Sequence, residues 1–172
     1  PAAPNPAVGG PGRGLADSLS TAPVALPGAG TRSVPRRGFV TDRHCNTCMD
    51  RVIVALLRHF DVHTLVSGGD DAFSGSFGFE SACTRNLADK TAQAHITDVF
   101  VGGNHDSPET MADEAKQRIK TLTDKVVVSD GVRFLGLPDP RTSRYGEGIV
   151  PATSADQHVV LVQQGTALGE LA

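Results

Sequence analysis

The chain of 172 residues contains no tryptophan, and aromatic residues make up only 5% of it. A hydrophobic core must therefore be built mainly from valine, leucine, isoleucine and alanine. No apolar run approaches the roughly 20 residues that a membrane-spanning helix needs, so we expect membrane association only through segments outside this chain. The net charge is −3 at pH 7, which gives no reason to expect nucleic acid or an anionic membrane surface as a partner.

Cysteine is also scarce. Three cysteines, an odd number, argue against a disulfide framework but leave room for one bridge. Cys45 and Cys48 form a C-x-x-C motif that directly follows His44. Two interpretations of this motif stay open: a thioredoxin-like redox pair, or half of a zinc site with Cys83 as a third thiolate. The glycine-rich residues 75–78 lack the Gly-Lys-Ser/Thr sequence of a P-loop, which excludes that type of nucleotide site.

Proline and glycine dominate the beginning of the chain. Seven of the eleven prolines lie before residue 36, interleaved with glycine, alanine and serine. Such a composition buries too little apolar surface to offset the entropy lost on ordering. We therefore expect residues 1–35 to form an extended arm or linker and residues 36–172 to form the folded domain. The chain begins with proline instead of methionine, which predicts that it has been processed or is an excerpt of a longer protein. Its compartment stays open: the cytoplasm, or the outer side of a membrane-anchored protein.

Hydrophobic periodicity predicts an α/β fold. Strands are predicted at residues 38–41, 63–67, 97–101 and 158–162. Helices are predicted at residues 49–60, at residues 80–90 and from Ser107, which is a good cap before Pro108. A hairpin is expected at residues 125–135, and the residues between it and the last strand read as loops. The alternation of strands and helices indicates a mostly parallel sheet with flanking helices.

Polar side chains that can bind metal follow each of the first three strands. They are Asp42 and His44, then Asp70, and then Asn104, His105 and Asp106. Because ligands bind at the carboxyl ends of parallel strands, we expect these groups to share one pocket. Gly69 allows a sharp backbone turn that aims Asp70 at this pocket, although Asp71 is an alternative ligand.

The order Asp-x-His, Gly-Asp and Gly-Asn-His-Asp resembles the calcineurin-like metallophosphoesterase superfamily, in particular its bacterial and actinobacterial members. The likeness rests on Asp42, His44, Gly69, Asp70 and residues 103–106. It covers about residues 36–162. It implies part of a four-layer α/β sandwich and, in a complete family member, two divalent cations such as Mn, Fe or Zn.

The resemblance also implies a role for each site residue. Asp42 and His44 would bind the first metal, Asp70 would bridge both metals, and Asn104 would bind the second. His105 would donate a proton to the leaving oxygen or stabilise the transition state there, and Asp106 would orient the His105 imidazole. Two cations about 3.5–4 Å apart clamp phosphoryl oxygens and turn a bound water into a nucleophile. The expected activity is therefore hydrolysis of a phosphomonoester or phosphodiester substrate.

The chain lacks the lone histidine and the Gly-His-x-His motif that complete this family pattern. Gln163 stands where a histidine is expected, and His158 lies at the wrong end of the predicted last strand. We therefore expect an incomplete metallophosphoesterase domain that holds at most one metal weakly and has weak or no activity. Either a missing C-terminal half or a protein partner would complete the fold. The competing hypothesis is a non-catalytic interaction subunit, a pseudo-phosphatase that docks through an exposed sheet face and the proline-rich arm.

Overall fold

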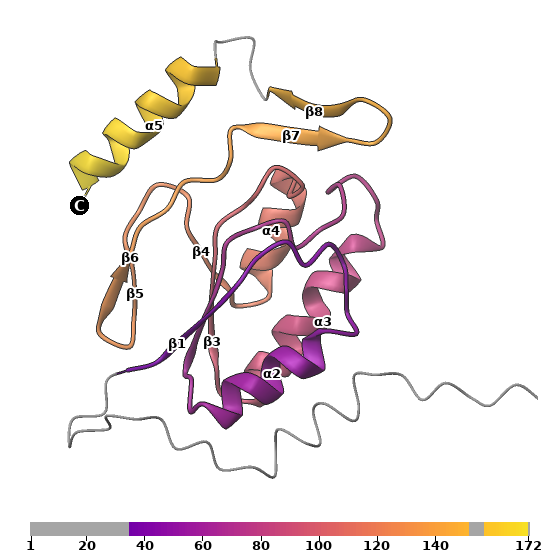
Figure 1. The fold of residues 1–172 in the computed structure, drawn as a ribbon, viewed down its shortest axis with the longest axis vertical. Helices are drawn as coiled ribbons and strands as arrows, with labels where there is room; N and C mark the ends of the chain where they lie inside the picture. Colours follow the sequence, from indigo (N-terminus) through magenta and orange to yellow (C-terminus); the bar gives the residue numbers. More distant parts are fainter. Residues whose placement is uncertain (1–34, 152–156, 172) are drawn as a thin grey trace, which may run out of the picture.

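The computed structural model describes residues 35–151 and 157–171, so the expected arm lies almost wholly outside the described residues (Figure 1). The first half consists of β1 (Arg37–Val40), α2 (Asp50–His59), β2 (Thr64–Ser67), α3 (Glu80–Gln93), β3 (Thr97–Phe100) and α4 (Pro108–Lys116). The second half consists of β4 (Lys120–Thr121), β5 (Val127–Ser129), β6 (Val132–Phe134), β7 (Arg141–Arg144), β8 (Gly148–Pro151) and α5 (Gln157–Leu171).

A four-stranded sheet in the order β1-β2-β3-β4 forms the centre of the molecule, and all its strand pairs are parallel. Each step along the sheet moves in the same direction, so right-handed crossovers place the connecting helices on one face. Figure 1 shows α2, α3 and α4 together on that side of the strands. The predicted α/β class, with a mostly parallel sheet flanked by helices, is confirmed.

The core lies between this sheet and α2 and α3. Its buried residues are Val54, Leu57, Val62, Leu65, Leu87 and Ile96, so it is aliphatic, as the composition requires. Gly38 allows β1 to approach α2 closely, because a Cβ at this position would meet the side chain of Leu57. The apolar spacing that predicts the first helix corresponds to the buried face of α2.

The predicted hairpin is present as the antiparallel pair β5 and β6. It is held at the beginning of β2, where Thr64 Oγ1 donates to Asp130 Oδ2 at 2.5 Å. It is also held at the beginning of β4, where Lys120 Nζ donates to the carbonyl of Val128 at 2.9 Å. In Figure 1 the hairpin lies on the side of the sheet away from α2 and α3. Phe39 of β1 is 71% exposed, so part of the sheet stays uncovered by the described residues.

The predicted strand at residues 158–162 is wrong, because these residues begin the helix α5. Short apolar runs do not distinguish a strand from a helix, and here the following Gln, Ala, Leu and Glu residues favour a helix. The supposed loops before it contain the antiparallel pair β7 and β8, so Arg141 and Arg144 lie on a strand. The short strand β4 is a further element that the sequence analysis misses. Within the described residues, no helix combines the length and hydrophobicity needed to cross a bilayer.

Candidate metal centre

Three loops meet at the carboxyl ends of β1, β2 and β3. The loop after β1 follows the backbone of the loop after β2: the N–H groups of Asp42, His44 and Cys45 donate to the carbonyls of Gly69, Asp70 and Asp71. The donor–acceptor distances are 3.0, 2.9 and 2.9 Å. These hydrogen bonds fix the first loop on the second. The side chains of both loops therefore stay together at the carboxyl end of the parallel sheet, where α/β folds bind their ligands.

The first loop is locally strained. Asp42, His44 and Cys45 all have positive φ angles, of 55°, 44° and 57°. Residues with a Cβ rarely adopt this left-handed region, and they persist there only when surrounding contacts hold them. The backbone hydrogen bonds to the second loop supply those contacts, so the side chain of His44 has a defined direction.

Two glycines bring the second and third loops together. Gly69 has a φ of 97°, and a Cβ at this position would lie 2.7 Å from the Cα of Gly103. A Cβ at Gly103 would in turn lie 2.7 Å from both the backbone N and the Cγ of Asp70. The space that a side chain at Gly103 would fill holds the Asp70 carboxylate, whose Oδ1 accepts a hydrogen bond from the N–H of His105 at 2.8 Å.

Asp106 organises the same two loops. Its buried carboxylate accepts hydrogen bonds from the N–H groups of Asp70, Ala72 and Gly103, at 2.7, 3.0 and 2.9 Å. Burial raises the pKa of Asp106 to about 6, although the N–H donors lower it in part. The prediction that Asp106 orients the His105 imidazole is wrong in detail, because its carboxylate positions the backbone around Asp70 instead.

Backbone carbonyls hold both imidazole rings. His44 Nδ1 lies 3.2 Å from the carbonyl oxygen of Ala72, and His105 Nδ1 lies 2.6 Å from that of Phe73. A carbonyl only accepts, so each Nδ1 carries the proton and each Nε2 keeps its lone pair. This is the arrangement of histidines that bind metals, in which the second ring nitrogen fixes the orientation. The two rings pack edge to face, with centroids 4.6 Å apart.

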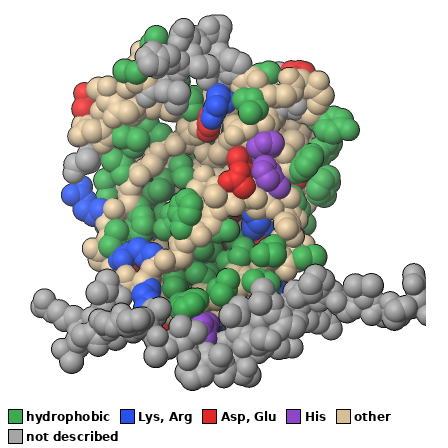
Figure 2. Space-filling model, viewed as in Figure 1, with side chains coloured by type: hydrophobic (Ala, Val, Ile, Leu, Met, Phe, Trp, Pro, Cys, Tyr) green, Lys and Arg blue, Asp and Glu red, His purple; other side chains and the backbone are tan. Residues whose placement is uncertain are grey.

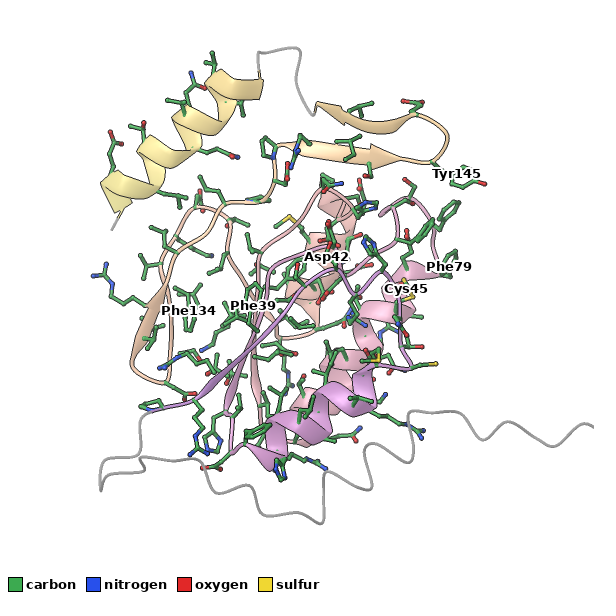
Figure 3. The ribbon with its side chains drawn as sticks, in the orientation of Figure 1. Phe39, Asp42, Cys45, Phe79, Phe134 and Tyr145 are labelled. Atoms are coloured by element: carbon green, nitrogen blue, oxygen red, sulfur yellow. A yellow bond between two sulfur atoms is a disulfide. The ribbon has the colours of Figure 1, made fainter. Side chains whose placement is uncertain are left out.

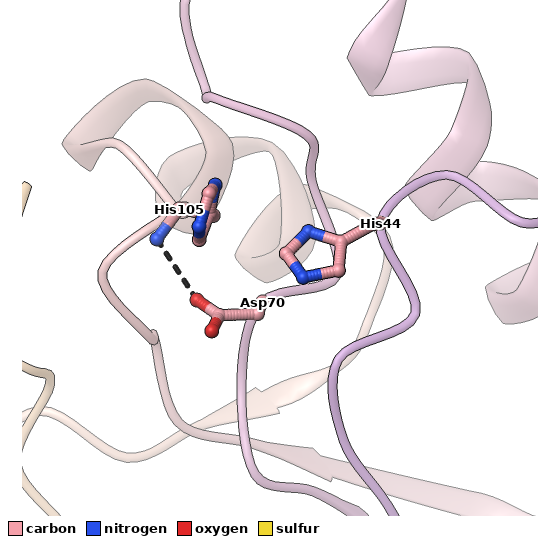
Figure 4. A group of neighbouring side chains, drawn as sticks. All are labelled: His44, Asp70 and His105. Atoms are coloured by element: carbon pink, nitrogen blue, oxygen red, sulfur yellow. Dashed lines mark hydrogen bonds between the residues drawn. The ribbon is translucent and has the colours of Figure 1, made fainter. Parts of the chain in front are cut away.

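His44, Asp70 and His105 form the candidate metal centre (Figure 4). Each offers one ligand atom, and the three atoms lie within 4.8 Å of one another. Bonds of about 2.0–2.2 Å place the ligand atoms of a tetrahedral site roughly 3.3–3.6 Å apart, so a cation would draw together any two atoms that lie near the 4.8 Å limit. Two imidazole nitrogens and one carboxylate oxygen are a donor set of catalytic zinc and non-haem iron sites. The donor chemistry of these residues therefore suits a single divalent cation.

The other two predicted metal ligands lie beside this centre. Asp42 Oδ1 is 3.9 Å from His44 Nε2, but the Asp42 side chain is 62% exposed and accepts a hydrogen bond from Thr41 Oγ1. Asn104 faces β7, where its Nδ2 donates to Ser143 Oγ at 2.7 Å. The structure thus brings His105, predicted as a proton donor, into the cluster and directs Asn104 towards the β7–β8 hairpin.

The alternative ligand Asp71 is buried beneath the loops. Arg43 forms ion pairs with Asp71 and Asp50, at 3.5 and 3.0 Å, and all three side chains are almost fully buried. Burial raises the pKa of Asp71, and the neighbouring Arg43 opposes this shift. Asp71 therefore contributes to the support of the first loop, and the preference for Asp70 as the residue facing the pocket agrees with the geometry.

A disulfide links Cys45 with Cys83 of α3. Cys48 is free and exposed. The structure contradicts both interpretations of the C-x-x-C motif, because the two cysteines of the motif do not pair and Cys83 is not available as a thiolate. Cys45 directly follows His44, so the bridge ties this ligand's loop to a helix. The motif gave no signal for this pairing, which depends on tertiary proximity.

Ser143 of β7 is a site residue that the sequence analysis misses. Its hydroxyl lies 3.1 Å from His105 Nε2 and accepts from Asn104, and its N–H donates to the Asn104 carbonyl at 2.6 Å. No pattern in the sequence around residue 143 indicates this position, because the contact depends on how the hairpin folds back over the loops.

Comparison with known proteins identifies no family for this chain. A scan against models of protein families finds no match for this chain, and a search of curated proteins finds none either.

Proposed function

We propose that the chain binds one divalent cation and hydrolyses a phosphoester, either a monoester or a diester. The observation that carries the proposal is the convergence of His44, Asp70 and His105 at the carboxyl ends of three neighbouring parallel strands. The order of these residues along the chain is the order in the calcineurin-like metallophosphoesterase pattern. The proposal thus rests on agreement between a motif and a geometry.

The protein's own groups prepare the site for a cation. His44 presents an Nε2 lone pair, whereas the Nε2 of His105 lies 3.1 Å from the Ser143 hydroxyl, which must turn away for a cation to bind there. Asp70 adds a negative charge whose position Gly103 and Asp106 fix. Asp42 adds a second carboxylate near His44. A bound Mn, Fe or Zn ion would polarise the phosphoryl group and lower the pKa of a bound water. With three protein ligands for one cation, we expect weak binding and slow turnover.

The test combines metal binding with hydrolysis. The chain is stripped with a chelator, titrated with Mn²⁺ or Zn²⁺ by calorimetry, and assayed with an aryl phosphate. We expect one cation per chain, and the Asp70→Ala variant should lose binding by at least about tenfold, the lower end for loss of a metal-site group. Asp89→Ala, which changes an exposed carboxylate of α3, is the matched control.

The role of His105 is separable in the same experiment. If His105 is a metal ligand, His105→Ala should lower both the cation affinity and the turnover. If His105 is only a proton donor, His105→Ala should lower the turnover and leave the cation affinity unchanged. That result would contradict the three-ligand centre. His63→Ala is the control, since His63 is exposed and lies at the opposite end of β2. Robust turnover by Asp70→Ala would refute the proposed function.

A second candidate function is that of a non-catalytic interaction subunit. It is favoured by an apolar groove of about 420 Å³ along β1 and α2, lined by Val40, Leu56, Phe60 and the exposed Phe39 among others. Metal content separates the two functions. A stoichiometric cation supports the enzyme, whereas a chain that binds no cation but forms a stable complex through Phe39 supports the interaction subunit.

A further inference from the structure

Exposed aromatic side chains surround one side of the candidate metal centre. The chain has seven phenylalanines and one tyrosine, and four of these eight residues lie in two neighbouring segments. They are Phe73, Phe77 and Phe79 in the loop between β2 and α3, and Tyr145 in the turn between β7 and β8. Figure 2 shows hydrophobic side chains beside the histidine and acidic side chains on this face. In a chain so poor in aromatic residues, this exposed concentration indicates a binding surface, and Phe73 and Tyr145 line the same hollow as His105.

The aromatic rings contact one another across the two segments. Phe77 and Phe79 stack with centroids 5.6 Å apart, and Phe77 meets Tyr145 edge to face at 6.0 Å. Tyr145 is 78% exposed and Phe79 is 61% exposed, so their faces are open to a ligand. Figure 3 places Tyr145 and Phe79 near each other at the edge of the molecule.

A buried carboxylate holds the loop that carries the phenylalanines. Glu80 is only 2% exposed, and its oxygens accept from the N–H groups of Phe73, Ser74 and Phe77, at 2.9, 2.6 and 2.8 Å. The loop is therefore fixed before any ligand arrives, which reduces the entropy lost on binding. The same loop positions His105, whose Nδ1 donates to the Phe73 carbonyl.

A hollow of about 260 Å³ lies between two of these rings and His105 of the candidate metal centre. It is lined by Phe73, Ser74, His105, Ser143, Tyr145 and two glycines of the β7–β8 turn. This volume is close to the lower limit of about 300 Å³ for small-molecule sites, so it suits one ring system. Among the described side chains of its lining, His105 is the only one that carries a charge, and then only when protonated.

We infer, on the basis of the proposed function, that the alcohol part of the substrate contains a flat aromatic ring that stacks in this hollow. The ring lies between Phe73 and Tyr145, and the phosphoryl group lies over His44 and Asp70. Hydrolysis forms a bond from water oxygen to phosphorus and breaks the bond to the leaving oxygen. The leaving oxygen takes up the proton that the water gives up. Aryl phosphates and nucleoside monophosphates share this ring chemistry.

The test compares phosphonates that differ only in the ring. Phenylphosphonate and methylphosphonate are titrated into the Mn²⁺-loaded chain by calorimetry. We expect phenylphosphonate to bind about tenfold more tightly, the gain typical of a good ring contact. Tyr145 is the only tyrosine and tryptophan is absent, so quenching of tyrosine fluorescence reports on this ring alone. Equal affinities, or tighter binding without quenching, would overturn the inference.

Variants test whether the hollow causes the preference for phenylphosphonate over methylphosphonate. Tyr145→Ala should reduce the ratio of phenylphosphonate to methylphosphonate affinity severalfold. Because Tyr145 is exposed, we expect this variant to fold like the wild type, and circular dichroism checks its fold. Ile149→Ala, an exposed change on β8 of the same hairpin, should leave the ratio unchanged. An unchanged ratio in Tyr145→Ala refutes the inference.

Two substrates identify the source of the ring. A higher kcat/KM for adenosine monophosphate than for phenyl phosphate indicates that the ring is a nucleobase, and the reverse indicates a simple aryl group. If the inference is correct, kcat/KM for each of these substrates exceeds that for glycerol phosphate. If the chain binds metal and hydrolyses all three equally, the proposed function stands and the ring inference falls. If it binds no metal, both fall.

Discussion

Replacement of Gly103 by alanine tests the closeness of the two central loops. The added Cβ would lie 2.7 Å from the backbone N of Asp70, nearer than real Cβ contacts come. This nitrogen cannot easily move away, because it donates to Asp106 at 2.7 Å. We therefore expect the Asp70 carboxylate to shift and to lose its hydrogen bond with the N–H of His105.

The size of the effect follows from these contacts. Overpacking costs about 1–3 kcal/mol, and a lost hydrogen bond to a charged group adds about 1.5–3 kcal/mol. For a domain of this size, ~3 kcal/mol corresponds to a fall in Tm of roughly 6–12 °C. Displacement of a group that orients a ligand lowers metal affinity by about 10- to 100-fold. Gly103→Ala should therefore show both a lower Tm and weaker Mn²⁺ binding.

Circular dichroism melting and calorimetric titration measure the two quantities. Gly78→Ala is the matched control, because a Cβ at this position has no heavy atom within 4 Å. The control should keep the wild-type Tm and Mn²⁺ affinity. If Gly103→Ala also keeps the wild-type Tm and Mn²⁺ affinity, the close contact between the loops and the position of the Asp70 carboxylate that depends on it are refuted.

Two further predictions concern the support of the site. Burial raises the pKa of Glu114 to about 8, from 4.5, and nearby carboxylates add to this, so folding takes up a proton and stability falls as pH rises between these values. In the wild type the free energy of unfolding should therefore fall by up to about 1.4 kcal/mol per pH unit in this range. Urea unfolding at pH 5 and pH 8 measures this fall, which Glu114→Gln should remove and Glu109→Gln, at an exposed position, should retain. Cys83→Ser should lower the free energy of unfolding by about 3–4 kcal/mol, the loop-closure value for bridged cysteines with a sequence separation of 38, while Cys48→Ser should leave the melting curve unchanged.

The sequence predicts the first half of the fold well because local signals there agree. Apolar spacing marks α2, and Ser107 caps α4 as expected, with its Oγ accepting from the N–H of Thr110. Alternating strands and helices leave few topologies, so the loops that carry His44 and Asp70 had to end on the same edge of the sheet.

The other features depend on contacts that no local pattern encodes. The pairing of Cys45 with Cys83 arises because α3 begins beside the first loop. The role of Ser143 arises because β7 folds back over the third loop. The helix α5 was missed because Val159 and its apolar neighbours suit either a strand or a helix, and only the residues that follow decide between them.

The ligands of the candidate centre come from three loops that stretch from residue 44 to residue 105. An unfolded chain cannot hold such distant groups around one ion, so any cation that binds here selects the native state. At a concentration one hundred times its Kd, the cation would add about 2.7 kcal/mol to the free energy of unfolding. Thermal melting in a series of metal salts would therefore rank the ions by affinity before any substrate is known.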